Sequence, residues 1–146
     1  MNQNAVNQAN MNVSLNSVQA DDLANIAESA TIAFAAGTQY VCGITITILN
    51  AYGVAIKKPV DIVVFRSTNA DGTTIVDSST TGLAVVTGEL MATLKAKAIL
   101  MVRTAATGII TMTDTDTSPA LDYIGVVLPN GKIVMSRVLA ATDFGS

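Results

Sequence analysis

The chain has 146 residues, half of them hydrophobic, with 13% charged, 4% aromatic and a net charge of −3. This length predicts one domain that can bury a core without stabilisation by disulfide bonds or a metal ion. The negative net charge argues against a nucleic-acid-binding surface. A typical soluble domain has about 25% charged residues. The shortage of charge therefore indicates that partners cover much of the surface; the alternative is an ordinary neutral β-domain with a Ser/Thr-rich surface.

The start of the chain, Met1 to Ala20, carries no charge and is rich in Asn and Gln. Such a composition cannot form a packed core by itself, so we expect an arm that becomes ordered against a neighbouring subunit; a tail without a role is the alternative. A short helix is predicted over residues 21–29, because acidic residues open it and apolar residues share one face. Residues 1–30 are therefore assigned to an N-terminal interaction arm.

From Thr31 onward the sequence has the pattern of β-structure. Residues 40–49 alternate between apolar and small polar side chains, a period of two that is typical of a half-buried strand. Gly, Asn and Pro punctuate the chain after this strand, and the Asn130-Gly131 pair between two apolar runs predicts a hairpin. Further strands are expected at 60–67, 73–77, 83–87, 98–104, 110–113, 123–128 and 132–139. The stretch 90–101 also fits helical spacing, although a strand is favoured for its second half.

About seven or eight strands separated by turn residues roughly every 8 to 12 residues predict a mainly β fold, an antiparallel β-sandwich over residues 31–146. An Ig-like sandwich is favoured, and a jelly roll or small barrel is the alternative. Residues 62–65, 99–102 and 124–128 are apolar on both faces, so we expect the N-terminal segment or another subunit to cover their outer face. The side chains expected in the core are Ile44, Ile46, Ile48, Val64, Phe65, Ile110 and Met112.

The residue types available exclude most catalytic templates. The chain has no His, no Trp and a single Cys, which rules out Ser-His-Asp and Cys-His catalysis and zinc sites built on Cys and His. Gly131-Lys132 is followed by Ile133, so the chain has no phosphate-binding loop of the Walker type. Cys42 lies in an apolar alternating run and is expected to be a small buried hydrophobe. We therefore expect no catalytic, cofactor-binding or metal-binding residues and no enzymatic activity.

Three aspartates near the end of the chain are the strongest candidates for a polar site. Asp114 and Asp116 have the Asp-x-Asp spacing that hard cations favour, and Asp122 follows shortly after. The segment lacks the Gly and the distal Glu of a calcium loop, so a plain Asx-type turn is favoured and a bound cation is the alternative. Catalysis through a carboxylate pair is the least favoured function.

No apolar run approaches the length of about 18 residues that a membrane-spanning helix requires. No secretory signal is recognised either, because the first basic residue is Lys57. We expect a mature protein that begins near Met1 and is made in a cytoplasm.

Three segments carry a resemblance to a known group of proteins. A Thr/Ile strand at 44–50 leads into Lys57-Lys58-Pro59-Val60, the turn at 104–108 precedes a strand ending in Thr113-Asp114-Thr115, and the closing hairpin spans 127–132. From about Tyr40 onward, roughly two-thirds of the chain, the sequence resembles small Ig-like proteins encoded in the head-gene regions of tailed bacteriophages.

The resemblance implies a virion protein, a capsid decoration or cement protein present in many copies on an icosahedral head. Its expected partners are the major capsid protein, copies of itself as a homo-oligomer (dimer or trimer), or both, without nucleic acid or membrane. Because bacterial Ig-like adhesin modules share the same turn pattern, a receptor- or surface-binding module of a phage fibre or adhesin is the alternative function.

Overall fold

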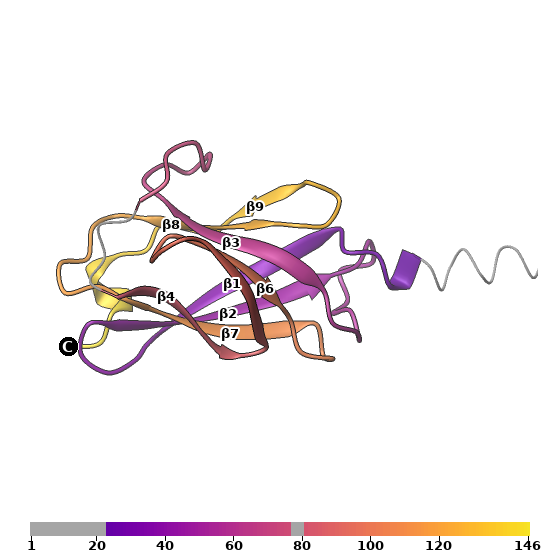
Figure 1. The fold of residues 1–146 in the computed structure, drawn as a ribbon, viewed down its shortest axis with the longest axis horizontal. Helices are drawn as coiled ribbons and strands as arrows, with labels where there is room; N and C mark the ends of the chain where they lie inside the picture. The colour runs from indigo at the N-terminus through magenta and orange to yellow at the C-terminus, as the bar shows by residue number, and fades with distance from the viewer. Residues whose placement is uncertain (1–22, 77–80) are drawn as a thin grey trace, which may run out of the picture.

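The structure, a computed structural model, describes residues 23–76 and 81–146, and the described chain forms two antiparallel β-sheets packed face to face (Figure 1). None of its helices is long and apolar enough to cross a membrane. The strands are β1 (Ser29–Ala36), β2 (Val41–Leu49), β3 (Asp61–Ser67), β4 (Gly82–Thr87), β5 (Glu89–Lys95), β6 (Ile99–Arg103), β7 (Ile109–Thr115), β8 (Tyr123–Val127) and β9 (Ile133–Met135), followed by a 3-10 turn, η1 (Ala141–Asp143).

The strand order confirms the predicted sandwich. One sheet has the order β1-β2-β7-β4, and the other has the order β5-β6-β3-β8-β9. Matching β1, β2, β3, β7, β8 and β9 to strands A, B, C, E, F and G of an immunoglobulin domain reproduces its ABE and CFG neighbours. β4 lies beside β7, in the place of strand D. This arrangement fits the Ig-like interpretation and not the jelly-roll alternative, although the chain visits β4 before the β5–β6 pair that extends the second sheet.

The core lies between the sheets, where the side chains of the period-two strands meet. In β2, Cys42, Ile44, Ile46 and Ile48 are each at most 1% exposed, while the intervening residues are partly or fully exposed. β2 pairs with β1 on one side and β7 on the other, so its backbone hydrogen bonds are satisfied and its apolar face is free to pack. All seven residues expected in the core are buried, as is Cys42.

The middle of the chain crosses from one sheet to the other at Gly88, between β4 and β5. Gly88 has φ +103, and a Cβ there would meet the carbonyl oxygen of Arg103, so only glycine fits this crossing. The helical alternative for residues 90–101 is wrong, because β5 and β6 form an antiparallel pair in that stretch. At 73–77 the described residues form only an isolated bridge, Ser67 to Ile75, and residue 77 lies outside the described ranges.

The helix predicted over residues 21–29 is corrected in its second half. Residues 23–24 are helical, and residues 21–22 lie outside the described ranges. The chain then turns, the backbone N–H of Glu28 donates to the carbonyl of Leu49, and Ser29 begins β1. Pairing with β2 therefore overrides the local helical pattern, and it brings Ala27 and Ala30 into the core.

The outer face of β3, which is apolar on both faces, is also covered in a way that differs from the expectation. Phe65 is 5% exposed although it lies on the outer face. Its ring lies where a Cβ of Gly125 would be, and a Cβ on Gly72 would meet both this ring and the sulfur of Met135. A turn after β3 and a residue of β9 therefore cover Phe65, so at this position the cover comes from the sandwich itself and requires neither the N-terminal arm nor a second subunit.

Candidate functional site

The three aspartates singled out by the sequence converge on one arginine that the sequence did not identify. Arg66, near the end of β3, lies 3.2 Å (Nε) from Asp114 Oδ2, while its Nη2 lies 3.2 Å from Asp116 Oδ2 and 2.6 Å from Asp122 Oδ2. All four side chains are at most 4% exposed. Because β3 and β7 belong to different sheets, we call these four residues the inter-sheet charge cluster.

The cluster has an excess of negative charge, since one guanidinium faces three carboxyl groups. Burial raises the pKa of Asp114 to about 6; the attraction of Arg66 opposes this rise, and repulsion from Asp116 and Asp122 adds to it. Within the described part of the chain, Arg66 Nη1 and both carboxyl oxygens of Asp114 lack a hydrogen bond. A buried polar group without a partner costs stability, so the cluster is a point at which stability depends on protonation.

The geometry of the cluster fits a structural role better than a chemical one. Asp116 also accepts a hydrogen bond from the backbone N–H of Ser118 at 3.0 Å, which is the Asx-type turn that the sequence favoured. The described residues contain no group of three or more His, Cys, Asp or Glu side chains placed to hold a metal ion. Arg66 already supplies a positive charge among the carboxylates, at a depth that a substrate cannot reach.

Cys42 is enclosed in the core, and burial raises the pKa of its thiol to about 11, with further contributions from Asp143 and Asp114. Reactive cysteines have a lowered pKa and are accessible to solvent, so Cys42 has the properties of a packing residue.

A second feature is the place where the N-terminal arm joins the sandwich. Side chains of the domain bind backbone carbonyls just before β1: Asn50 Nδ2 donates to Ala24 at 3.1 Å, Asn130 Nδ2 to Ala27 at 3.4 Å, and Lys132 Nζ to Glu28 at 3.0 Å. These bonds hold residues 24–28, the last part of the predicted arm, against the loops at one end of the sandwich. We call this the arm root.

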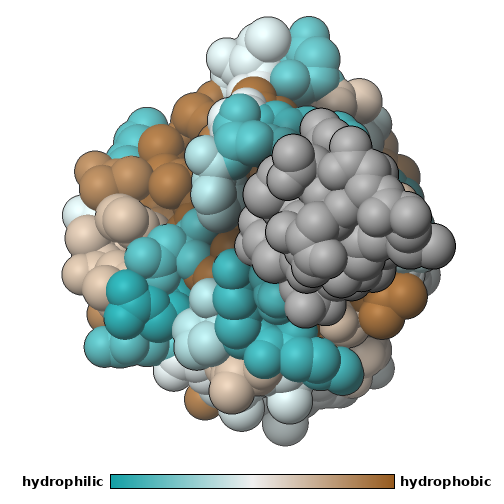
Figure 2. Space-filling model, turned by 90° about the vertical axis from the view of Figure 1, so that its right-hand side faces the viewer, coloured by the Kyte–Doolittle hydropathy of each residue, from teal (hydrophilic) through white to brown (hydrophobic). Residues whose placement is uncertain are grey.

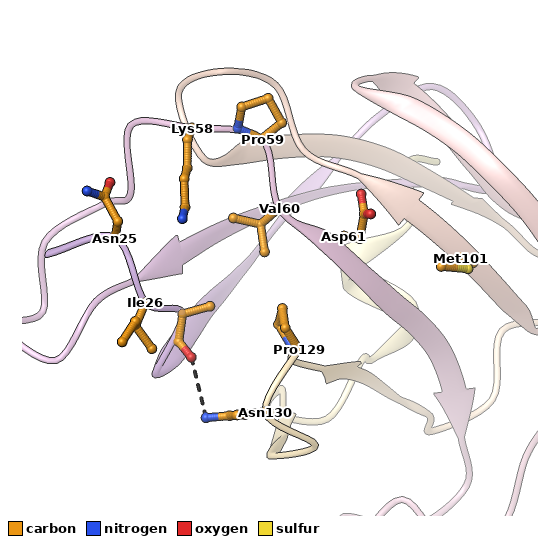
Figure 3. A pocket seen from close by; sticks show the side chains of 10 residues that line it. Asn25, Ile26, Lys58, Pro59, Val60, Asp61, Met101, Pro129 and Asn130 are labelled. Carbon is orange, nitrogen blue, oxygen red and sulfur yellow. Dashed lines mark hydrogen bonds between the residues drawn. The ribbon is translucent and has the colours of Figure 1, made fainter. Parts of the chain in front are cut away.

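Beside the arm root lies a hollow of about 710 Å³. Residues 25–27, 58–61 and 129–130, together with Met101, line it. Figure 3 shows the Asn130 amide reaching the backbone of residue 27 across one side, with Lys58 and Val60 on the other. Viewed from this end, the surface around the root mixes hydrophilic and hydrophobic groups (Figure 2). Among the described residues that line the hollow, only Lys58 and Asp61 are charged.

The sequence pointed to the aspartates but not to Arg66, the hollow or the arm root, because their members lie far apart in the chain. A basic residue inside an otherwise apolar strand, as in Ile62-Val63-Val64-Phe65-Arg66, was the one available signal, since a charge in such a run needs a buried partner. A scan against protein-family models, a search of curated proteins and a search of solved structures each return no match.

Proposed function

We propose that the chain is a structural virion protein without enzymatic activity, a decoration or cement protein that binds in many copies to a bacteriophage head. The observation that carries the proposal is the amount of large apolar side chain left on the surface of a complete sandwich. Within the described residues these exposed side chains are Leu23, Ile26, Tyr40, Tyr52, Val54, Val86, Leu90, Met91, Leu94, Leu121 and Ile133.

Exposed apolar groups together with few charges favour association over solubility as a monomer. In a decoration protein, a coat lattice or further copies of the chain cover these groups. The partners that fit this role are the major capsid protein and copies of the chain itself, and the place of action is the virion after synthesis in the host cytoplasm. The resemblance to phage head Ig-like proteins supports the same assignment.

The chemistry of the described residues supports a role in binding. The three aspartates that meet are buried against Arg66, and the single thiol is enclosed in the core. These buried groups are therefore out of reach of a substrate in solution for acid–base or nucleophilic catalysis.

The arm root supports separate roles for the arm and the sandwich. Hydrogen bonds from Asn50, Asn130 and Lys132 hold residues 24–28 in place, so whatever precedes them starts from a defined point. The Asn/Gln-rich composition of residues 1–20 provides donors and acceptors that can pair with a neighbour's backbone without burying charge. We propose that this segment contacts the adjacent capsid protein.

The test is a truncation that removes residues 1–20 and leaves the arm root intact. The truncated protein should fold as the intact chain does but should be depleted from particles assembled with the cognate coat protein. The matched control is a full-length chain in which residues 1–20 are scrambled, which separates the order of the amides from their number. Equal occupancy by truncated and intact proteins would show that the sandwich alone carries attachment.

Copy number in purified particles separates this function from the alternative. A decoration protein should approach the copy number of the coat protein or of its symmetry-related positions. A handful of copies per particle would instead indicate the receptor- or surface-binding module of a fibre, and absence from particles would refute a virion role.

A further inference from the structure

Strand β5 is an edge of the five-stranded sheet and is unusually open. Within the described part of the chain it pairs only with β6, and six of its seven residues are exposed, Ala92 being half-buried. Leu90 and Leu94 are 50% and 58% exposed. A long apolar edge open on both faces is a site for pairing with another strand.

The opposite side of the sandwich, where edge strand β9 of the five-stranded sheet meets edge strand β1 of the four-stranded sheet, is protected. There, β1 packs against β9 and η1, and the guanidinium of Arg137 lies 4.9 Å from the centre of the Phe34 ring. Arg137 is held in turn by Asp143, with 2.6 Å between Nη2 and Oδ1. A charged side chain fixed over an edge discourages pairing, so β5 is the more available edge.

Two bulges give β5 an unusual repeat. Residues 89, 92 and 95 pair with Arg103, Met101 and Ile99, while Leu90 and Thr93 pair with Val102 and Leu100. Paired side chains point to the same face, and Val102 and Leu100 are buried in the core. Residues 89, 92 and 95 therefore share the outer face, every third residue, whereas a regular strand places every second residue on a face.

We infer that β5 pairs antiparallel with β5 of a second copy of this chain, about a two-fold axis that passes through Ala92. In this register Glu89 lies opposite Lys95 of the copy and Leu90 lies opposite Leu94, each pair occurring twice. Both charges lie on the outer face. Leu90 lies on the inner face with Val102, and Leu94 is the exposed extra residue of the second bulge. An isologous contact requires this self-complementarity, and the sequence Glu-Leu-Met-Ala-Thr-Leu-Lys at 89–95 provides it.

The bulges select the partner. Bulges normally impair edge pairing, because a regular strand loses register against a bulged one. A second β5 has the same three-residue repeat, so residues 89, 92 and 95 meet 95, 92 and 89 without a slip. The two sheets then join into one continuous sheet across the dimer. This inference adds to the proposed function by naming the surface that joins copies of the chain. The presence of such a dimer in a particle rests on the proposed function.

Charge exchange tests the register directly in the purified full-length chain. Sedimentation velocity over a concentration series should show a dimer for the wild type. Glu89→Lys or Lys95→Glu alone places like charges opposite each other twice and should raise the dimer dissociation constant by about tenfold. The double exchange restores both pairs and should return the constant to near the wild-type value. A double variant as weak as the single variants would overturn this register.

Two further variants test the apolar contact and the axis. Leu94→Lys should abolish the dimer, whereas the control Leu121→Lys, on a side chain that is 67% exposed in a loop before β8, should leave it intact. Ala92→Cys should form an intermolecular disulfide on mild oxidation, because directly opposed strand residues lie within disulfide range, and Ala84→Cys on β4 should not. Thermal unfolding of each variant checks that the sandwich persists.

A wild type that is monomeric or trimeric in solution, or a dimer insensitive to Leu94→Lys, would overturn the inference. These outcomes are distinct from those for the proposed function. A chain without β5 pairing that still fills particles would refute only the dimer, and a β5 dimer that is absent from particles would refute only the virion role.

Discussion

Replacing Asp114 by Asn should make the protein more stable near neutral pH and remove part of its pH dependence. Asn has the shape of Asp and the charge of its protonated form. It keeps an oxygen beside Arg66, whose Nε lies 3.2 Å from the carboxyl oxygen in an ion pair. The change therefore reduces the excess negative charge of the inter-sheet cluster by one while leaving its packing in place.

The size of the effect follows from the pKa of Asp114, which rises from 3.8 to about 6 on folding. The folded protein therefore holds a proton more tightly than the unfolded chain, and the free energy of unfolding falls as pH rises through this interval. A rise of about two pKa units corresponds to about 3 kcal/mol, which is fully lost above roughly pH 7. Near pH 3.8 and below, the wild type and the variant should be almost equally stable.

Urea unfolding of both proteins across the acid-to-neutral range measures this difference. Asp61, Asp71 and Asp143 have pKa values lowered by hydrogen bonds to Arg103, Thr73 and Arg137, so they add stability as pH rises, but they do so equally in both proteins. The exposed Asp71→Asn is the matched control and should not stabilise the protein at neutral pH. If Asp114→Asn is less stable than the wild type at neutral pH, Arg66 needs the Asp114 charge and the reasoning fails.

Three further outcomes are expected. Arg66→Ala leaves three buried carboxyl groups without their cation and should lower the free energy of unfolding by about 3 to 5 kcal/mol, measured by urea denaturation; a loss below about 1 kcal/mol would mean that the cluster is solvated. Gly108→Ala, at φ +73, directs a Cβ at the Ile56 carbonyl oxygen, whereas Gly53→Ala has the same φ and open space around it. Gly53→Ala should lower the free energy of unfolding by about 1 kcal/mol and Gly108→Ala by much more, measured by urea denaturation. Equal losses would contradict this packing. Cys42, buried and with its pKa raised to about 11, should react with a thiol reagent only at the rate of unfolding, and fast labelling in the folded state would place it at the surface.

The sequence alone determined the local elements of this protein. The period-two run of β2 and the turns at Asn50, Asn69 and Asn130 are set by residues close together in the chain. In the structure the backbone N–H groups of Gly53, Gly72 and Gly131 donate to the carbonyls of Asn50, Asn69 and Leu128. The absence of His and the single Cys limited the available chemistry without any structure.

Only the tertiary structure decided where those elements meet. Arg66 is 50 and 56 residues from Asp116 and Asp122, and no local pattern encodes which sheet each strand joins. The bulges of β5 break the period on which strand assignment depends, so this stretch fitted a helix as well as a strand. The cover of Phe65 by residues around Gly72 and Met135 depends on the path of the chain after β3. Side-chain periodicity is a property of neighbouring residues, whereas the pairing of sheets and of buried charges depends on contacts between distant ones.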